Sequence, residues 1–421
     1  MLLAAPAFFS VASSSSSSSS CSLCAPFHYG LLRSFKRLNS KPRSSCLCRA
    51  SLITDADSFQ VGRLIGSYGF MNVTSYTGFQ SAEDTEYLSD NMGRLRVQDV
   101  GEGSVKIRLY EGRITQGPFR GTPVIFKVYP GQRAGGAEAD MMAANELNAH
   151  AFLQSSSKDP CQNLLVLLGG FETKTGEQWL AFRDGGKYSA ADYAKVMSEK
   201  LSRARPGGEQ QFWNPFEHEQ TIKYRRYFVI KLLQGALSGL AYMHDHDRLH
   251  QSLGPSSVVL NTMVERDATY LVPRLRDLAF SVDIRYSSLE EIPGTLSDGL
   301  WRRASAAGAF SPMEKRAFGI SDDIYEAGLL LAYLAFVPFC EAGIMDGLSL
   351  QRLLESTFKL DLEAAREYCL ADDRLSEAVK FLDLGDGAGW ELLQAMLNPD
   401  HRKRPIAEAV LNHRFITGTI L

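Results

Sequence analysis

Short runs of alternating or strongly apolar residues mark the first patterned part of the chain. Residues 104–110 alternate between apolar and polar, residues 112–114 continue the run, and residues 124–129 are rich in β-branched and aromatic side chains. A period of two is typical of a half-buried strand, and β-branched and aromatic residues favour strands. Gly-Pro and Gly-Thr-Pro turns at residues 117–118 and 121–123 separate these runs. The pattern therefore predicts a group of strands over this part of the chain.

Residues 137–154 predict a helix with an acidic residue in its apolar stripe. Met142, Ala149 and Leu153 share one face, and Glu146 lies among them at spacings of four, three and four. A carboxylate in such a stripe is costly unless it is paired, so Glu146 requires a buried cation.

The pattern changes from strands to helices further along the chain. Residues 164–169 and 178–182 predict two more strands, whereas residues 224–244 carry apolar positions at helical spacing. Two short strand-like runs follow at residues 257–260 and 271–275, and the remainder is mostly helical. A small β-rich lobe that precedes a larger α-rich lobe is an α+β arrangement with a cleft between its halves, where pockets tend to form.

The most apolar run, residues 327–340, is too short to span a membrane. Its 14 residues rise about 21 Å as a helix, against a hydrocarbon core of roughly 30 Å. We therefore expect a buried core helix and no transmembrane span. Two other segments fall outside the pattern: residues 51–94, interpreted as an amino-terminal extension of uncertain order, and residues 189–222, interpreted as a surface insertion.

The first 50 residues have the composition of a targeting segment. They contain eight consecutive serines and six basic residues, and the first acidic residue is Asp55. A Ser-rich, Arg-bearing and acid-free amino terminus is typical of an organellar transit peptide. Because no Arg precedes Arg33, a chloroplast address is favoured over a mitochondrial one. A secretory signal is the alternative, since residues 2–12 are apolar, but no basic stretch precedes them.

Composition and charge then narrow the function classes. The chain has 421 residues, of which 45% are apolar and 22% charged, which excludes a fibrous or wholly disordered protein. Its formal net charge is −3, but without the six basic residues of the leader 39 basic residues face 48 acidic ones, a net charge of −9. With an acidic body and no recurring stripe of aromatic and basic residues, we expect no nucleic-acid binding.

The cysteines indicate neither a metal site nor a disulfide framework. Four of the seven, at positions 21, 24, 46 and 48, belong to the leader. Cys161, Cys340 and Cys369 remain, with no pair and no histidine cluster at metal-ligand spacing. We therefore expect neither zinc nor haem.

Two motifs near the carboxy terminus resemble a known family. Residues 398–405 read NPDHRKRP, and residues 323–328 read DIYEAG. They are similar to the DPxxRP ending and the D-x-Y-S-x-G helix start of eukaryotic-type protein kinases. The resemblance covers residues 95–417 and implies a bilobal kinase-like domain, with a small β-rich lobe over residues 95–183 and a larger helical lobe over residues 184–417.

The resemblance also implies structural roles for four residues. Residues 311–314 read SPME and resemble the A-P-E motif with one extra residue, so Glu314 is expected to pair with Arg404. Asp323 begins the D-x-Y-S-x-G segment, and His250 begins the catalytic loop. In the family these residues hold the large lobe together.

The catalytic loop keeps its frame but not its chemistry. Residues 250–260 read HQSLGPSSVVL and align without gaps to H-R-D-L-K-P-x-N-hydrophobic-L-L. In the family the Asp accepts the substrate proton, the Lys steadies the transferring phosphoryl group and the Asn holds a metal ion. Ser252, Gly254 and Ser257 stand in those places. Serine is a poor proton acceptor without its own base, and glycine has no charge to offer, so efficient phosphoryl transfer is not expected.

The nucleotide side is better preserved. Gly101 and Gly103 resemble the start of the phosphate-covering glycine loop, and residues 124–127 read VIFK, as the family's V-A-I-K strand does. The resemblance implies that Lys127 contacts the nucleotide phosphates and that Glu146 orients it. Asp277, in the sequence RDLAF, stands at the Asp of D-F-G and is expected to hold Mg²⁺ if ATP binds.

Residues 66–70, GSYGF, also look like a glycine loop when read alone. Gly69 lies 58 residues before Lys127, where the family allows about one hairpin. The motif is therefore assigned to the amino-terminal extension, and its role is left open.

The sequence as a whole resembles a chloroplast pseudokinase. Such a protein binds a plastid protein partner, holds ATP without transferring phosphate, and resides in the stroma or peripherally on the thylakoid. The alternative is an active but atypical Ser/Thr protein kinase, since phosphoryl transfer depends mainly on positioning and electrostatics. Small-molecule kinase chemistry is a third reading, although the motif around Arg404 resembles protein kinases more closely.

Overall fold

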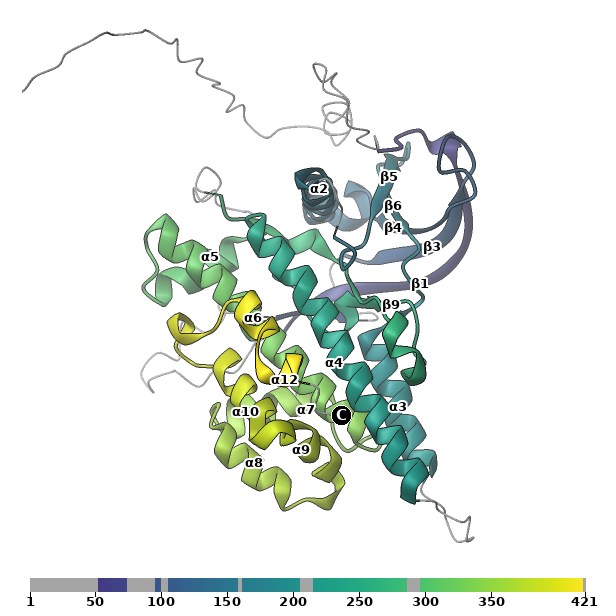
Figure 1. Ribbon diagram of the computed structural model, residues 1–421. Helices are drawn as coiled ribbons and strands as arrows, with labels where there is room; N and C mark the ends of the chain where they lie inside the picture. The colour runs from purple at the N-terminus through teal and green to yellow at the C-terminus, as the bar shows by residue number, and fades with distance from the viewer. Residues whose placement is uncertain are drawn as a thin grey trace, which may run out of the picture.

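The structure consists of a small sheet-based lobe and a larger helical lobe (Figure 1). The computed structural model describes residues 52–73, 95–99, 105–157, 161–204, 215–285 and 296–418. The predicted leader over residues 1–50 lies outside the described residues. The α+β, bilobal architecture expected from the sequence is confirmed.

The small lobe is built on a six-stranded sheet in which neighbouring strands are antiparallel. The order across the sheet is β2-β1-β3-β4-β6-β5. The strands are β1 (Phe59–Val73), β2 (Leu95–Asp99), β3 (Ile107–Ile114), β4 (Pro123–Tyr129), β5 (Leu167–Glu172) and β6 (Gln178–Arg183). Helix α2 (Gln132–Ser156) packs against the sheet and carries the predicted apolar stripe.

Alternation along β4 determines which side chains face the cleft. Phe126 and Val128 are buried in an aromatic-rich cluster on one face of the sheet, where Phe59 meets Phe126 edge-on at 5.5 Å between ring centroids. Lys127 and Tyr129 point to the opposite face, and Tyr129 packs in the cluster that includes Met142 of α2. A period of two therefore sends Lys127 toward α2 and the cleft.

Strand β1 lies within the segment predicted to be an extension. Its first part pairs with β3 from Phe59 opposite Ile114 to Tyr68 opposite Ile107, and its second part pairs with β2. The sheet of the small lobe therefore begins well before the predicted boundary at residue 95. The strand escaped detection because residues 61–65 are all exposed and two register shifts interrupt the pairing, so no alternation marks it.

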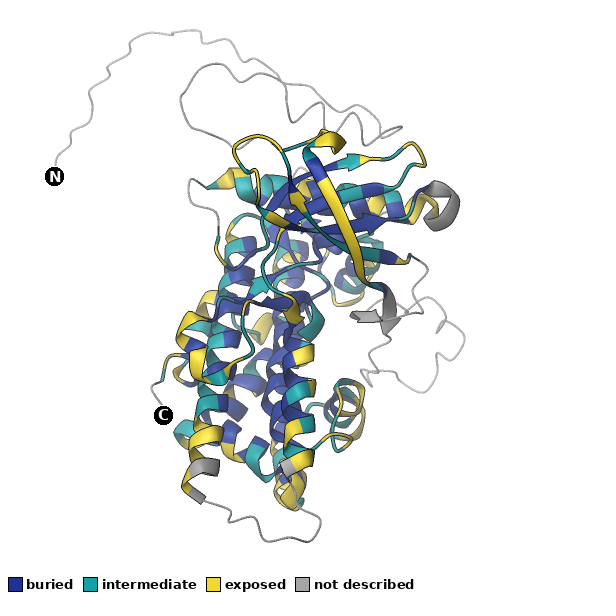
Figure 2. Cartoon of the chain, turned by 90° about the vertical axis from the view of Figure 1, so that its right-hand side faces the viewer, coloured by how far each residue is buried: buried dark blue, intermediate teal, exposed yellow. Residues whose placement is uncertain are grey.

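The large lobe is organised around two long helices, α4 (Pro215–Asp245) and α6 (Pro312–Phe336). Smaller helices pack around them: α3 (Ala190–Ala204), α5 (Asp298–Ala306), α7 (Gly347–Arg352), α8 (Leu362–Leu370), α9 (Ser376–Leu382), α10 (Leu384–Met396), α11 (Ala407–Leu411) and α12 (Arg414–Thr417). Buried positions concentrate on their inward faces (Figure 2). The apolar run at 327–340 is a buried core segment, as predicted, and continues from α6 into a 3-10 turn, Val337–Phe339.

In the part of the chain that the structure describes, no helix combines the length and apolar character that crossing a membrane requires.

The predicted surface insertion over residues 189–222 is wrong at both of its ends, since residues 215–222 begin α4 and Ile222 is buried. Residues 190–204 form helix α3, whose Ala190, Tyr193 and Met197 are buried in the core of the large lobe. Tyr193 stacks on Phe228 of α4 with ring centroids 4.5 Å apart. The buried residues recur at helical spacing, but charged residues lie between them, so this apolar stripe was not recognised in the sequence. Residues 205–214 lie outside the described part of the chain.

Two small sheets fix the loops that lie between the lobes. Strands β7 (Tyr188–Ser189), β9 (Val258–Leu260) and β10 (Arg274–Leu275) form one, and β8 (Arg248–Leu249) pairs with β11 (Val282–Asp283) in the other. The catalytic-loop residues therefore run from β8 to β9, and Asp277 lies between β10 and β11.

Candidate nucleotide site

Strand β4 and helix α2 bring Lys127 and Glu146 together, as the sequence predicts. Lys127 Nζ donates to Glu146 Oε2 at 2.6 Å, and the two side chains are only 5% and 1% exposed. Tyr129, two residues along β4, donates its phenol hydrogen to the same Glu146 oxygen. The acidic residue in the stripe of α2 thus has the buried cation that its position requires.

Asp277 joins this pair from the other lobe. Lys127 Nζ donates to Asp277 Oδ1 at 2.8 Å, although 150 residues separate the two in sequence. The backbone of Asp277 is left-handed, with φ 67° and ψ 47°, which Asp tolerates better than most residues. On its other side, Arg276 Nε lies 3.3 Å from Asp277 Oδ2.

Tyr68 of β1, a residue that was not predicted to belong to the site, completes the cluster. Its hydroxyl donates to Asp277 Oδ1 at 2.7 Å, and the residue is 5% exposed. Its ring centroid lies 5.7 Å from Lys127 Nζ and 5.9 Å from the guanidinium carbon of Arg276. The glycine-flanked motif at 66–70 therefore reaches the cleft after all. The motif is far from Lys127 in sequence because β1 pairs with β2 before the chain reaches β3 and β4, so this distance did not exclude it from the cleft.

The electrostatics of the cluster follow from burial and pairing. Burial alone would raise the pKa of Asp277, but Lys127 and Arg276 lower it to about 2. Burial opposes the charged form of Lys127, yet the Asp277 and Glu146 carboxylates hold its pKa well above the ordinary value. For Glu146, burial outweighs the attraction of Lys127, and its pKa is raised. Asp277 and Lys127 are thus the strongly charged partners.

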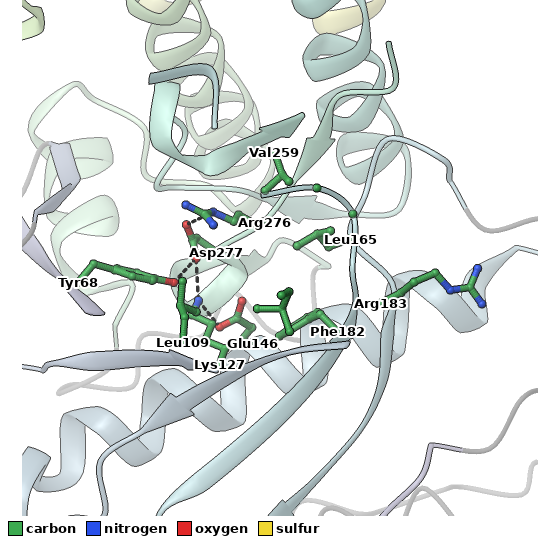
Figure 3. A pocket seen from close by; sticks show the side chains of 13 residues that line it. Tyr68, Leu109, Lys127, Glu146, Leu165, Phe182, Arg183, Val259, Arg276 and Asp277 are labelled. Atoms are coloured by element: carbon green, nitrogen blue, oxygen red, sulfur yellow. Dashed lines mark hydrogen bonds and ion pairs between the residues drawn. The ribbon is translucent and has the colours of Figure 1, made fainter. Parts of the chain in front are cut away.

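A pocket with an empty volume of about 440 Å³, part of it open to solvent, surrounds the cluster (Figure 3). Its apolar walls are Leu109, Ile125, Leu165, Phe182 and Val259. Its polar end holds Tyr68, Lys127, Glu146, Arg276 and Asp277. An apolar slot that leads to two cations suits a ligand with a flat apolar part and an anionic tail.

Glycines at the connection between the lobes form one edge of this pocket. Gly186 has φ +135°, and a Cβ there would lie 1.9 Å from the carbonyl oxygen of Leu260. Only glycine allows the chain to pass this close to β9.

The catalytic loop is held by one carboxylate of α6. Asp323 is fully buried, and its two oxygens accept the backbone N–H of His250 at 2.8 Å and of Gln251 at 2.9 Å. His244 Nε2 lies 2.9 Å from the same carboxylate, and these contacts keep the pKa of Asp323 low despite its burial. The structure thus places His250 and Asp323 together, as the resemblance implies.

The three residues at the predicted catalytic positions form hydrogen bonds within the loop or to the backbone of Asp277. Ser252, 5% exposed, lies 3.4 Å from His250 Nδ1 and donates to the carbonyl oxygen of Asp277 at 2.9 Å. Ser257 Oγ accepts the N–H of Gly254 at 2.9 Å and donates to its carbonyl at 2.8 Å. None of the three supplies a charge or a carboxylate base facing the pocket.

The predicted pair between Glu314 and Arg404 is wrong. Glu314 is the third residue of α6, and its carboxylate accepts from Ser311 N at 2.9 Å and from Phe310 N at 3.1 Å in a capping box. Arg404 donates to the carbonyls of Asn398 and Ser321, at 2.8 and 3.1 Å, and lies over the ring of Tyr325. Among the described residues, no ion pair joins the two side chains.

The predicted glycine-loop residues Gly101 and Gly103 lie outside the described residues.

The pocket is a poor site for Mg²⁺. Within the described ranges, no three Asp, Glu, His or Cys side chains gather as a metal would need. Asp277, the carboxylate expected to hold the ion, already has Lys127 within 2.8 Å and Arg276 within 3.3 Å. Ser257 stands where the family has the metal-binding Asn, and its hydroxyl is already hydrogen-bonded to the backbone of Gly254. Asp277 Oδ2 is buried and accepts no hydrogen bond from the described residues, but one carboxylate oxygen beside two cations is too small a ligand set to fit a divalent ion well.

The fold and this cluster define a class. A small antiparallel sheet with one helix, a strand lysine paired to a helix glutamate, and a loop aspartate from a helical lobe together make a protein kinase-like fold. Among solved structures, the chain is similar to a crystal structure of an Stt7 homologue from Micromonas algae soaked with ATP. The TM-score is 0.53 at 17% identity, and the alignment covers 91% of this chain and 99% of that one. Neither a family model nor a curated protein matches the chain. At this identity the likeness concerns the fold alone.

Proposed function

We propose that this protein binds a nucleotide in the cleft of a kinase-like fold, does not transfer phosphate efficiently, and acts by holding a partner protein in the chloroplast. One observation carries the proposal. The ionic cluster of Lys127, Glu146 and Asp277 is intact, whereas the adjacent loop offers no charged side chain at positions 252, 254 and 257.

The pocket supports nucleotide binding through its two ends. The base would lie between Ile125 of the small lobe and Val259 of the large lobe, which face the same cavity. The phosphates would extend toward Lys127, whose three donors can be shared between carboxylate and phosphate oxygens. The similar Stt7 homologue was soaked with ATP, which is in keeping with this assignment.

The loop geometry argues against efficient transfer. A general base must accept the proton of the attacking hydroxyl, but Ser252 Oγ is a donor to the Asp277 carbonyl. With glycine at position 254, no cation from this loop can steady the moving phosphoryl group. Loss of a general base alone typically reduces the rate by about 10²–10⁴.

The chloroplast assignment depends on the leader, and the partner assignment follows from the missing chemistry. The acid-free, Ser-rich segment over residues 1–50 has the composition of a transit peptide. A kinase-like body that does not turn over serves as a binding surface, so the partner is a plastid protein.

Thermal unfolding of the protein with ATP tests the nucleotide part. A ligand that binds only the native state stabilises it by RT ln(1 + [L]/Kd), so millimolar ATP should raise the melting temperature. The same ATP should not shift a Lys127→Met variant, whereas Lys174→Met, on an exposed turn, should respond like the wild type. A folded wild type whose melting temperature is unchanged by millimolar ATP would contradict nucleotide binding.

An active, atypical kinase is the second candidate, because the lysine, glutamate and aspartate that position ATP in kinases are all in contact. In that case the protein would transfer phosphate from ATP to a protein hydroxyl. Phosphate transfer by the wild type at a rate typical of kinases, lost in both Lys127→Met and Asp277→Asn, would favour this candidate over the non-catalytic one.

A further inference from the structure

We propose that the site binds a nucleoside triphosphate without a divalent cation, with the guanidinium of Arg276 beside Asp277 in place of a metal. The inference rests on the proposed nucleotide binding. It adds that the nucleotide is bound free of metal and that Arg276 makes this possible. Kinase-type sites ordinarily use the metal to bridge the Asp to the phosphates.

Backbone and side-chain contacts hold Arg276 in the site. Its backbone N–H donates to the carbonyl of Ser257 at 2.9 Å, and its Nε donates to the carbonyl of Ser256 at 3.1 Å. The same Nε lies 3.3 Å from Asp277 Oδ2. Its side chain is only 23% exposed and lines the pocket, so the guanidinium has a fixed position next to the carboxylate.

The charge distribution around Asp277 decides between a metal and a phosphate. Lys127 and Arg276 approach the carboxylate from two sides (Figure 3). A doubly charged ion brought to the same carboxylate would meet two cations already there. A triphosphate brought to this end of the pocket would instead be attracted by the same two cations, and would share their N–H donors with the Asp277 and Glu146 carboxylates.

The chemistry of the two cations suits a phosphate chain. An arginine presents several N–H donors in a planar fork that matches phosphate oxygens, and lysine acts as a compact point charge. The two side chains lie on either side of Asp277, so they can contact successive phosphates of one ligand. Ser257, whose family counterpart would bind metal, has its hydroxyl satisfied by Gly254 and needs no ion.

Calorimetric titration of the full chain with ATP tests the proposal, once in EDTA and once in excess MgCl₂. We expect the dissociation constant in EDTA to be no weaker than that in MgCl₂. Arg276→Ala should weaken binding in EDTA by roughly tenfold to a hundredfold, as loss of a charge-assisted contact implies. Because this variant also leaves Asp277 with one cation fewer, added MgCl₂ should restore part of its affinity, whereas it should not improve the wild type.

Two variants control for folding and for net charge. Arg276→Lys keeps the charge and should bind ATP in EDTA within several fold of the wild type. Arg183→Ala removes an exposed arginine from the rim of the same pocket and should bind like the wild type in both conditions. The melting temperature without ATP reports whether each variant is folded.

The outcomes separate this inference from the proposed function. Binding that requires MgCl₂ in the wild type would overturn metal-free binding and leave the nucleotide site in place. Absence of binding in both conditions would overturn both. Equal weakening by Arg276→Ala and Arg183→Ala would show that Arg276 contributes only general positive charge, and would overturn its assigned role.

Discussion

The ionic cluster around Lys127 and the loop over residues 250–257 are neighbours in the cleft, but their polar groups are used differently. In the cluster, charged side chains from β4, α2 and the segment after β10 meet across the two lobes. In the loop, small polar side chains bond to the loop's own backbone or to that of Asp277. The cluster joins distant segments through charge, whereas the loop uses neutral hydrogen bonds that stabilise its own shape and hold the backbone of Asp277.

The difference shows which parts of a kinase site also serve the fold. Lys127, Glu146 and Asp277 are so deeply buried that losing any one would leave the others uncompensated. The absence of charged side chains at positions 252, 254 and 257 leaves no buried charge unpaired. The backbone of the loop is held by Asp323, which accepts the N–H groups of His250 and Gln251. The loop therefore keeps its backbone geometry without a charged side chain at these three positions.

Replacement of Lys127 by Met should have the largest effect on this contrast. The change leaves two buried carboxylates without their shared cation and should lower the free energy of unfolding by about 3–5 kcal/mol. Urea denaturation measures it, with Lys174→Met as the matched control in an exposed position. A loss below 1 kcal/mol would show that the cluster does not hold the lobes together.

Asp323→Ala should also lower the free energy of unfolding, but by less than Lys127→Met does. It leaves the buried N–H group of His250 and the partly buried N–H group of Gln251 without acceptors, which should cost about 3 kcal/mol in all. Hydrogen exchange should become faster at these two amides, while the amides of β4 keep their protection. Unchanged exchange at His250 and Gln251 would mean that Asp323 does not support the loop.

Restoring a carboxylate at position 252 should fail to restore a catalytic site. Ser252→Asp replaces a buried donor to the Asp277 carbonyl with an acceptor, which should destabilise the fold by about 2 kcal/mol. Denaturation measures the stability, and phosphate transfer from ATP is followed in parallel. A stable variant with strong transfer activity would show that the loop lacks only its base.

Acid should destabilise the small lobe through His150. This residue packs edge-on against Phe182 at 5.0 Å, and burial, followed by repulsion from Lys127, lowers its pKa to about 3. In the unfolded chain His150 takes up a proton near pH 6.5, whereas in the folded chain it stays neutral. The free energy of unfolding therefore falls as the pH drops below about 6.5. At pH 5.5 one such group costs about 1.4 kcal/mol. The fall between pH 7.5 and 5.5 should be smaller in His150→Asn, and an unaltered slope would count against this assignment.

Tyr68→Phe should have the smallest effect. It removes one hydrogen bond to Asp277 and should lower the free energy of unfolding by about 1 kcal/mol. Because the Asp277 carboxylate loses a donor that offsets its negative charge, ATP bound without a metal should bind a few times less tightly by calorimetry. Tighter ATP binding would indicate that the Tyr68 hydroxyl competes with the nucleotide for this end of the pocket.

The pairing of Lys127 with Glu146 could be predicted because each residue is anomalous in its own element. A lysine in a buried strand and a glutamate in an apolar stripe each require a partner, and the family resemblance supplied the register between them. The helical core at 327–340 was equally readable, since its pattern is long and continuous.

Tyr68 and Arg276 could not be predicted in the same way. Tyr68 lies on a strand whose alternation is broken by exposed residues and bulges, and its partner is 209 residues away. Arg276 is next to a recognised aspartate but carries no pattern of its own, and only the geometry shows that it approaches the carboxylate. For Glu314 the sequence predicted a long-range ion pair that the structure does not contain. The residue instead forms the capping box of α6, and a glutamate at this position is compatible with either role.

The central claim is that the site binds ATP and leaves it intact. The direct measurement is to incubate the protein with ATP labelled on its γ-phosphate, quench at intervals, and separate bound ATP, free phosphate and phosphoprotein. The account predicts near-stoichiometric recovery of intact bound ATP over many minutes. Labelled phosphate on a protein hydroxyl, formed at rates that Asp277→Asn abolishes, would contradict it.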